Sequence, residues 1–550
     1  MTVLTRKMLR DIRRNLGALI SVIAITAVGI GDFIGLRSAQ AILHTSQQTY
    51  YNRYRFADFW VDVKKAPVSA AERVADLPGV SKLDTRIVFD VIIDLPDVER
   101  PLTGRLISTP EQGFRDTING IHLVRGSGFS DDRDEEVILS EEFAAANGLR
   151  PGDSIELILN RKRESFVIVG TAISPEYVYM VRGEGDIIPD PKHFGTLYVK
   201  DDYAREALSF KNAFNQIVGQ LAPGSNVDVD VLLDQIDAML EPYGVLAKTP
   251  RARQASNRFL SDEIAGLDTF SYIVPTIFLV VAALVLNVVM ARLAERQRTI
   301  IGTLKALGHS DRSVFIHFLT LGTAVGAAGG LFGIGIGLGL TYLLIEIYKE
   351  FYNFPEFFFS PQLDVLFVSM GIAVAFALVG TTRGVWGVLQ LSPAEAMRAA
   401  PPEQGGATFL ERFPFIWERL GFRTHMAIRS LARHRGRTTT GVIASGLSTA
   451  LIFATFSLMG SVWHLVDFQF DRSAHSDVDI GMRDEASLGA LFETRQLPGI
   501  DRAEPLFGLT CDIRNGRRSR RISITGLSRE HTLTTPLTED GTPITIPRRG

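Results

Sequence analysis

The sequence predicts a multi-pass α-helical membrane protein with five spans, a large α+β extracytoplasmic domain and the start of a second one. Two observations lead to this fold class. The chain of 550 residues is 46% hydrophobic, and its apolar residues are concentrated in long runs with almost no charge. Between the first two runs lies the block 37–268, which mixes strand and helix patterns and is long enough to bury its own core.

Each of the five runs can cross the hydrocarbon core, which takes ~20 helical residues. The predicted spans are 15–36, 269–291, 313–345, 365–386 and 438–466. The first run follows a basic start, 1–14, as a signal peptide would. No small-x-small cleavage site follows it, so a retained span is favoured. Asp32 is expected near the outer end of this span, where solvation explains it more simply than a function inside the membrane.

The block 37–268 contains short patterns of both types. Alternating apolar residues predict strands at 56–63, 155–159 and 165–169, the last two as a hairpin. Helical patterns predict helices at 69–77, 140–147 and 228–240. The segment 221–226, which contains Pro and Gly, predicts a boundary between two lobes.

The distribution of basic residues predicts the orientation. Basic residues gather in 6–14, 292–312 and 383–437, whereas the loop 346–364 has one basic residue and four acids. The positive-inside rule therefore puts the N-terminus in the cytoplasm and 37–268 outside. It also makes 401–437 a cytoplasmic linker and 467–550 the start of a second outer domain.

The stretch 292–312, RLAERQRTIIGTLKALGHSDR, joins two predicted spans. Its apolar residues recur at helical spacing among basic ones, so it predicts an amphipathic helix on the cytoplasmic surface. Ile301, Leu304 and Leu307 are expected to face the membrane or a partner. Gly302 and Gly308 would permit a close approach or end the helix.

Glycines recur at every fourth position of the third span. They fall in two sets, Gly322, Gly326 and Gly330, and Gly329, Gly333 and Gly337. In an apolar span this small-xxx-small pattern predicts close helix packing. A phosphate-binding loop is the weaker alternative, because no strand precedes the glycines and no Lys-Ser/Thr closes them.

The chain contains an internal repeat at an offset of about 419 residues. The segment 9–14 matches 428–433, each before a span, and 57–58 matches 476–477. Leu77-Pro-Gly-Val80 matches Leu497-Pro-Gly-Ile500, one residue further on. The second copy stops within its outer domain, so we expect the chain to be a fragment or a shortened form of a two-repeat protein.

Several functions find no support in the sequence. There is no P-loop, no His-rich metalloprotease motif and no nucleophile elbow, so we predict no catalytic residues, no metal and no cofactor. The single cysteine, Cys511, excludes an intrachain disulfide. The acidic run 131–136 could hold a cation, but it lacks the EF-hand glycine and a surface loop is favoured. The net charge of −3 gives no attraction to nucleic acid.

Three local patterns resemble bacterial ABC-transporter permeases of the FtsX-like, MacB-like type. Glu295-x(5)-Ile301-Gly-x-Leu-Lys-Ala-Leu-Gly308 resembles the family's coupling segment. The glycine-rich span and Ser392-Pro-Ala-Glu-Ala-Met-Arg398 resemble the end of its core module. Segments 124–126, 148–153 and 166–170 resemble the MacB-like periplasmic core. The likeness assigns 37–268 to that core and 269–400 to an FtsX-like domain.

The resemblance implies a bacterial inner-membrane permease subunit without enzymatic activity. A separate ATPase dimer would bind ATP and move the outer domains, for export or extraction of a lipid, lipoprotein, peptide or drug. A periplasmic adaptor or enzyme would be a further partner. The alternative is a mechanical signalling protein that activates an outer enzyme without transport. The expected ATPase-coupling residues are Glu295, Arg296, Ile301, Gly302, Leu304, Lys305, Leu307 and Gly308.

Overall fold

The computed structural model divides the chain into two units, 1–444 and 445–550. It describes residues 10–95, 102–111, 116–160, 162–183, 186, 188–225, 227–359, 362–398, 415, 421–433, 435–482, 487–515, 518–528, 531–538 and 541–544.

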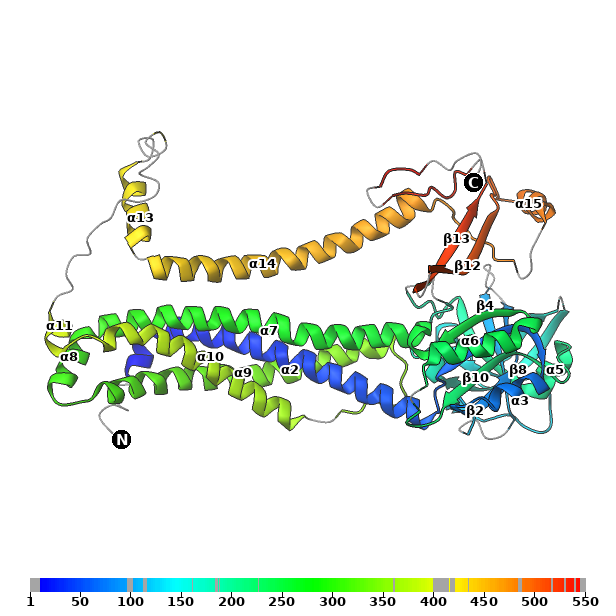
Figure 1. Ribbon diagram of the computed structural model, residues 1–550, viewed down its shortest axis with the longest axis horizontal. Coiled ribbons are helices and arrows are strands. Elements are labelled where there is room, and N and C mark those ends of the chain that lie inside the picture. Colours follow the sequence, from blue (N-terminus) through cyan, green and yellow to red (C-terminus); the bar gives the residue numbers. More distant parts are fainter. Residues whose placement is uncertain are drawn as a thin grey trace. The chain divides into compact units, whose positions relative to one another are not determined.

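The first unit contains a bundle of long helices and a folded outer domain (Figure 1). The bundle helices are α2 (Leu16–Arg53), α7 (Ala255–Arg296), α9 (Asp311–Phe351) and α10 (Leu363–Leu389). Together with Thr438–Ser473, five helices among the described residues are long and apolar enough to cross a membrane, which confirms the predicted class. Both α2 and α7 are much longer than a span, and their polar ends pack in the outer domain.

Helix α9 packs against two neighbours through two rows of glycine. A Cβ added to Gly322 or Gly326 would meet Thr381 or Ala377 of α10 at 2.1 or 2.7 Å. A Cβ on Gly333 or Gly337 would meet Ile30 or Ile34 of α2, at 2.7 or 2.6 Å. The other members of the predicted rows are equally confined, Gly330 against Met370 and Gly329 against Thr26. The glycines therefore let three helix backbones approach closely.

The outer domain has two sheets that form two lobes. The first sheet has the order β11-β1-β10-β2, and the second β5-β8-β6-β9-β4-β3-β7, in which β7 also pairs with β8 and closes a barrel. The first-lobe strands are β1 (Phe59–Pro67), β2 (Val80–Arg86), β10 (Ala213–Leu221) and β11 (Val245–Pro250). The barrel strands are β3 (Val88–Asp94), β4 (Leu102–Thr109), β5 (His122–Gly126), β6 (Glu136–Ser140), β7 (Ser154–Leu159), β8 (Lys162–Ile173) and β9 (Phe194–Lys200).

Short helices complete each lobe. Helices α3 (Val68–Ala75) and α6 (Val229–Leu240) cover one face of the first sheet, whereas α4 (Glu141–Ala146) and α5 (Asp201–Ala207) pack on the barrel. The predicted hairpin is confirmed, because Ile155 pairs with Phe166 in β7 and β8. The predicted lobe boundary at 221–226 is wrong. The barrel is inserted between β2 and β10, so the chain crosses between lobes near Ile87 and again before Ala213.

One buried carboxylate joins the lobes to helix α7. Glu176, in the short helix η1 (Pro175–Tyr177), accepts hydrogen bonds from Arg86 Nη1 at 2.7 Å and from Trp60 Nε1 at 2.6 Å. Its carbonyl accepts from the side chain of Gln254, the N-cap of α7, at 2.8 Å. Burial raises the pKa of nearby Asp62, whose carboxylate accepts from Gln216. The ion pair and its hydrogen bonds connect β1, β2 and the barrel to the start of a bundle helix.

Further elements follow the bundle. Helix α13 spans Phe422–Arg433, and α14 spans Arg435–Val466 and continues into a π-helical segment, Asp467–Ser473. Helix α15 (Leu488–Arg495) precedes a hairpin of β12 (Leu506–Asn515) and β13 (Arg518–Leu527). This hairpin repeats the β3–β4 register. Val88 pairs with Ile107, and the residues 419 positions later, Phe507 and Gly526, pair with each other.

Candidate functional site: a platform at one end of the bundle

The polar stretch between α7 and α9 forms a short separate helix. Helix α7 ends at Arg296 and α8 runs Arg298–Ala306, at the end of the bundle away from the outer domain (Figure 1). Gly308 has a φ of +94°, its N–H donates to Lys305 O, and His309 N–H donates to Leu304 O. This pair of bonds is a Schellman motif, which ends α8 and uses the left-handed conformation that glycine adopts at little cost.

The inner side of α8 packs against the bundle. Ile301 is 1% exposed and lies in a cluster with Leu293, Phe318, Val385 and other residues of α7, α9 and α10. Leu304 is half-buried and lines a small depression beside His317. Ile301 therefore anchors α8 to its own chain and is not accessible to a partner in this conformation.

A second short helix, α11 (Pro393–Met397), lies against α8 and starts with a capping box. Ser392 Oγ accepts from Glu395 N–H at 3.3 Å, and Glu395 Oε2 accepts from Ser392 N–H at 3.1 Å. These bonds to the ionised form lower the pKa of Glu395. A Cβ on Gly302 would meet Met397 Cγ at 2.9 Å and Ala396 Cβ at 3.0 Å. Only glycine lets α8 and α11 pack this closely.

Two basic side chains attach α8 to its surroundings. Lys305 Nζ donates to the carbonyl oxygens of Leu389 and Leu391 at 2.6 and 2.9 Å, and pairs with Asp311 at 2.6 Å. Its side chain is 6% exposed. Arg298 Nη2 donates to Glu395 O at 2.9 Å. Lys305 thus satisfies the last carbonyl of α10 and that of Leu391 just beyond it, while Arg298 holds α11.

The outer side of α8 is exposed and partly apolar. Leu307 is 79% exposed and Ile300 48%, and Met397 of α11 lies nearby at 45% exposure. Glu295 and Arg296, at the end of α7, are also exposed. Of the residues expected to couple to an ATPase, Glu295, Arg296 and Leu307 are available for contact. Ile301, Gly302 and Lys305 hold α8 in place, and Gly308 ends it.

Sequence reasoning missed the partners of α8. Asp311, Glu395 and Met397, which contact α8, were not among the expected site residues, and neither was Arg298, the first residue of α8. The pattern Ser392-x-x-Glu395 indicates a helix start. Nothing in the linear sequence shows that this helix packs on Gly302, almost 100 residues earlier. Among the described residues, no group of three or more His, Cys, Asp or Glu side chains could hold a metal.

Helices α8 and α11 together form a small platform at this end of the bundle. These features define a polytopic membrane protein whose spans connect the platform to a large folded domain. Residues 272–393, which include α8, α9 and α10, match the family model described as FtsX-like permease C-terminal. This part of the chain is therefore an FtsX-like permease domain. A comparison with curated protein sequences gives no match.

Three solved structures are similar to part of the chain. The periplasmic region of MacB from Actinobacillus actinomycetemcomitans is 13% identical, with 40% of this chain and 98% of that chain covered and a TM-score of 0.25. The extracellular domain of the noncanonic ABC-type transporter YknZ from Gram-positive bacteria is 12% identical, with 35% and 98% covered and a TM-score of 0.24. A permease-protein domain from Porphyromonas gingivalis is 14% identical, with 38% and 97% covered and a TM-score of 0.24.

Proposed function

We propose that this chain is the membrane-spanning permease subunit of an ABC transporter. A separate ATPase dimer binds the exposed side of α8 and α11, and its cycle of ATP binding and hydrolysis moves the outer domain. The cargo is a lipid, lipoprotein, peptide or drug. The observation that carries the proposal is an exposed apolar residue, Leu307, at the C-cap of a short helix that is clamped to the bundle within an FtsX-like permease domain.

The clamp makes α8 suitable for transmitting force. Ile301, Gly302 and Lys305 connect it to the bundle core, to α11 and to the end of α10. A partner that pushes on Leu307 therefore displaces these elements together, because packed interfaces shift as units. A loosely attached helix would absorb the same push without moving the spans.

Continuous helices connect the platform to the outer domain. Helix α7 has 42 residues, a length of about 63 Å at 1.5 Å per residue, which exceeds the ~30 Å hydrocarbon core. Its N-cap, Gln254, is hydrogen-bonded at the Glu176 junction. A displacement of α8 is thereby carried to both lobes. In this proposal the N-terminus lies in the cytoplasm and the outer domain lies beyond the inner membrane, as the positive-inside rule predicts.

The test identifies candidate ABC ATPases among the neighbouring genes and reconstitutes each of them with this chain. Leu307→Asp puts a charge on the contact and should reduce ATPase binding at least about tenfold, equivalent to about 1.4 kcal/mol. Leu246→Asp is the matched control, since Leu246 is 62% exposed but lies in the outer domain. Gly302→Trp should retain some binding while losing ATPase stimulation, because it separates α8 from α11. Normal binding and stimulation by both platform variants would refute the assignment.

The same reconstitution separates transport from signalling. Cargo moved across or out of the bilayer in an ATP-dependent manner supports the transporter. ATP-dependent activation of an outer hydrolase without cargo movement would support the alternative.

A further inference from the structure

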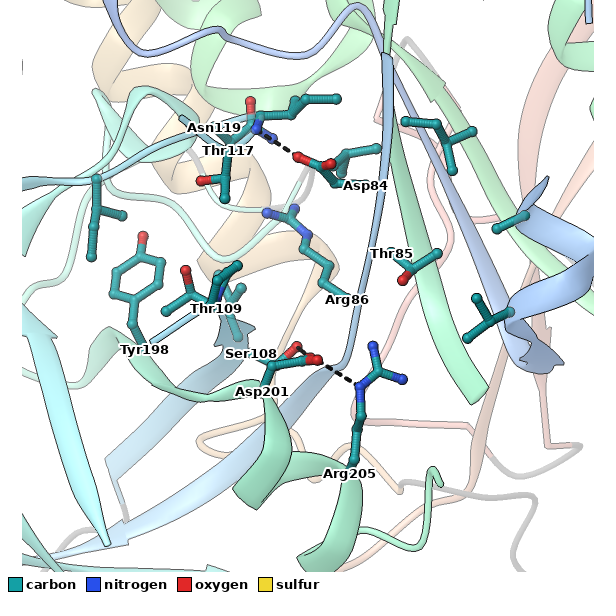
Figure 2. Close-up of a pocket in the computed structure, with 18 of the residues that line it drawn as sticks. Asp84, Thr85, Arg86, Ser108, Thr109, Thr117, Asn119, Tyr198, Asp201 and Arg205 are labelled. Carbon is teal, nitrogen blue, oxygen red and sulfur yellow. Dashed lines mark hydrogen bonds and ion pairs between the residues drawn. The ribbon is translucent and has the colours of Figure 1, made fainter. Parts of the chain in front are cut away.

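A cleft of about 400 Å³ lies between the two lobes of the outer domain, far from the platform (Figure 2). The first lobe contributes α3 and β2, and the second contributes the end of β4 and the start of α5. In Figure 2, Arg86 lies in the middle, with Asn119 and Asp84 on one side and Asp201 and Arg205 on the other. Pockets of this size between lobes are common ligand sites.

The cleft reaches the free edge of strand β2. Four consecutive residues of β2, Leu83 to Arg86, line it. Successive side chains of a strand point to opposite faces, so a run of four lining residues means that the cleft follows the strand's edge. β2 is the last strand of its sheet and pairs with β10. Within the described residues, the backbone of Ser81–Arg86 has no other backbone partner.

The opposite wall is a strand that stops pairing at this point. Strands β2 and β3 are continuous through Ile87, and β4 pairs with β3 up to Ile87, whose carbonyl accepts from Ser108 N–H at 2.8 Å. In an uninterrupted antiparallel ladder, Arg86 and Thr85 would pair with Thr109 and Pro110. Instead, these residues line the cleft. Pro110 has no N–H, so the β4 side cannot complete the ladder.

The cleft offers hydrogen-bond donors in a slightly negative lining, because its acids are Glu72, Asp84 and Asp201 and its bases are Arg86 and Arg205. Arg86 is neutralised by Glu176, and Arg205 donates to Asp201 at 2.6 Å. Three of the five N–H groups of Arg86 are used by Glu176 and Gln216. Asn119 is 5% exposed, its Oδ1 accepts from Ala57 N–H, and its Nδ2 has no partner among the described residues. Such a lining disfavours an anion and suits an uncharged ligand that is rich in carbonyl acceptors.

We propose that the interlobe cleft binds an extended polypeptide segment of an outer partner protein, which adds to β2 as a further strand. The peptide's main chain pairs with the edge of β2, and its carbonyl groups receive bonds from Asn119 and Arg86. Apolar side chains of the peptide contact Val68, Ala71 and Leu83. This mode of recognition takes affinity from main-chain hydrogen bonds and specificity from alternate side chains. The site goes beyond the ATPase coupling proposed above and does not depend on it.

The experiment uses the full-length protein in detergent and a phage-displayed library of linear peptides. The best peptides are synthesised with normal amides and with alternate amides N-methylated. We expect N-methylation in one of the two alternating registers to weaken binding at least about tenfold, because it removes the donors that pair with β2. An equal affinity of all N-methylated forms would exclude strand addition.

A reversible block locates the site without changing the fold. Thr85→Cys in a Cys511→Ser background is labelled with a bulky methanethiosulfonate, which should abolish peptide binding, and a reductant should restore it. The matched control is Leu246→Cys, on β11 at the other edge of the same sheet. Binding that survives the label on Thr85→Cys, loss of binding on labelling the control, failure to enrich any peptide, or selective binding of neutral oligosaccharides would each overturn the proposal.

Discussion

The two copies of the internal repeat share their local structure but differ in how their spans are buried. In the first copy, α3 ends at Ala75 and the turn Leu77-Pro-Gly-Val80 follows it; in the second, α15 ends at Arg495 and Leu497-Pro-Gly-Ile500 follows it. Gly79 has a φ of +98° and Gly499 of +88°, and the hairpins that follow share one register. Yet half of the most apolar window of α2 is buried, whereas none of that window is buried in α14.

The difference teaches what a span needs from its neighbours. In α2, Thr26, Ile30 and Ile34 receive the glycine backbone of α9. The residues 419 positions later in α14 are Ser445, Thr449 and Phe453. A turn and a hairpin form from local bonds, but a buried span requires a complementary surface on another helix. Four predictions test this contrast, from the largest expected effect to the smallest.

Arg86→Met should destabilise the first outer domain most. It leaves Glu176, whose side chain is 5% exposed, as an unpaired buried charge, which costs about 3–5 kcal/mol. The residue 419 positions later is Pro505, so the second copy has no equivalent pair. The loss of stability is measured by unfolding the full chain with denaturant and using proteolysis of the outer domain as the readout. Addition of Glu176→Gln should recover part of it, and a double variant as unstable as Arg86→Met would contradict this account.

Gly333→Leu should disrupt the packing of α9 on α2. The new side chain collides with Ile30, and overpacking of this kind costs about 3 kcal/mol. Gly335→Leu is the control, because a Cβ there meets nothing within 4 Å. Thermal unfolding in detergent should separate the two variants. If both unfold at the same temperature, the glycine rows do not determine the packing.

Stability of the barrel should depend on pH through Glu142. Burial raises the pKa of Glu142 to about 7, and its Oε2 has no partner among the described residues. The unfolded chain ionises Glu142 near pH 4.5 and the folded chain near 7, so the protein loses stability as pH rises through this window. The size of the pKa shift limits the loss in free energy of unfolding to about 3.4 kcal/mol, and the partial exposure of Glu142 reduces the expected loss to about 2 kcal/mol.

Glu142→Gln removes this titration. The variant should match the wild type at pH 4 and exceed its stability at pH 8, as measured by chemical unfolding at each pH. An identical pH dependence in both proteins would show that Glu142 ionises freely in the folded state.

The smallest expected effect is the difference in stability loss between Gly79→Ala and Gly499→Ala. Both place alanine in the left-handed region, which costs about 1 kcal/mol. A Cβ on Gly79 also meets Val227 Cγ2 at 2.6 Å, whereas one on Gly499 meets nothing within 4 Å. Gly79→Ala should therefore lose about 1 kcal/mol more than its counterpart. Hydrogen exchange at the two turns measures both effects, and equal losses would mean that the contact with Val227 relaxes freely.

Much of the fold could be predicted because its determinants are local. Charge-free runs gave the five candidate spans, and the glycine spacing gave the two packing faces of α9. The prediction of a lobe boundary at 221–226 was wrong for a physical reason. Pro and Gly at 221–226 mark a turn, but a turn does not show which strands pair, and β10 returns to β1 and β2 across the whole barrel. The insertion is set by the first sheet, whose strands pair residues more than 100 positions apart, such as Val61 with Ile217 and Arg86 with Gln216.

In the platform, too, some features follow from the local sequence and others depend on the tertiary structure. The sequence by itself determined that 292–312 is amphipathic, that Gly308 can end a helix and that Ser392 and Glu395 can start one, because these properties depend on neighbours within one turn. Only the tertiary structure decided that Ile301 and Lys305 face inward, that Gly302 contacts α11 and that Leu307 remains exposed. Which side of an amphipathic helix is covered depends on the elements packed against it, and their positions are set by the whole bundle.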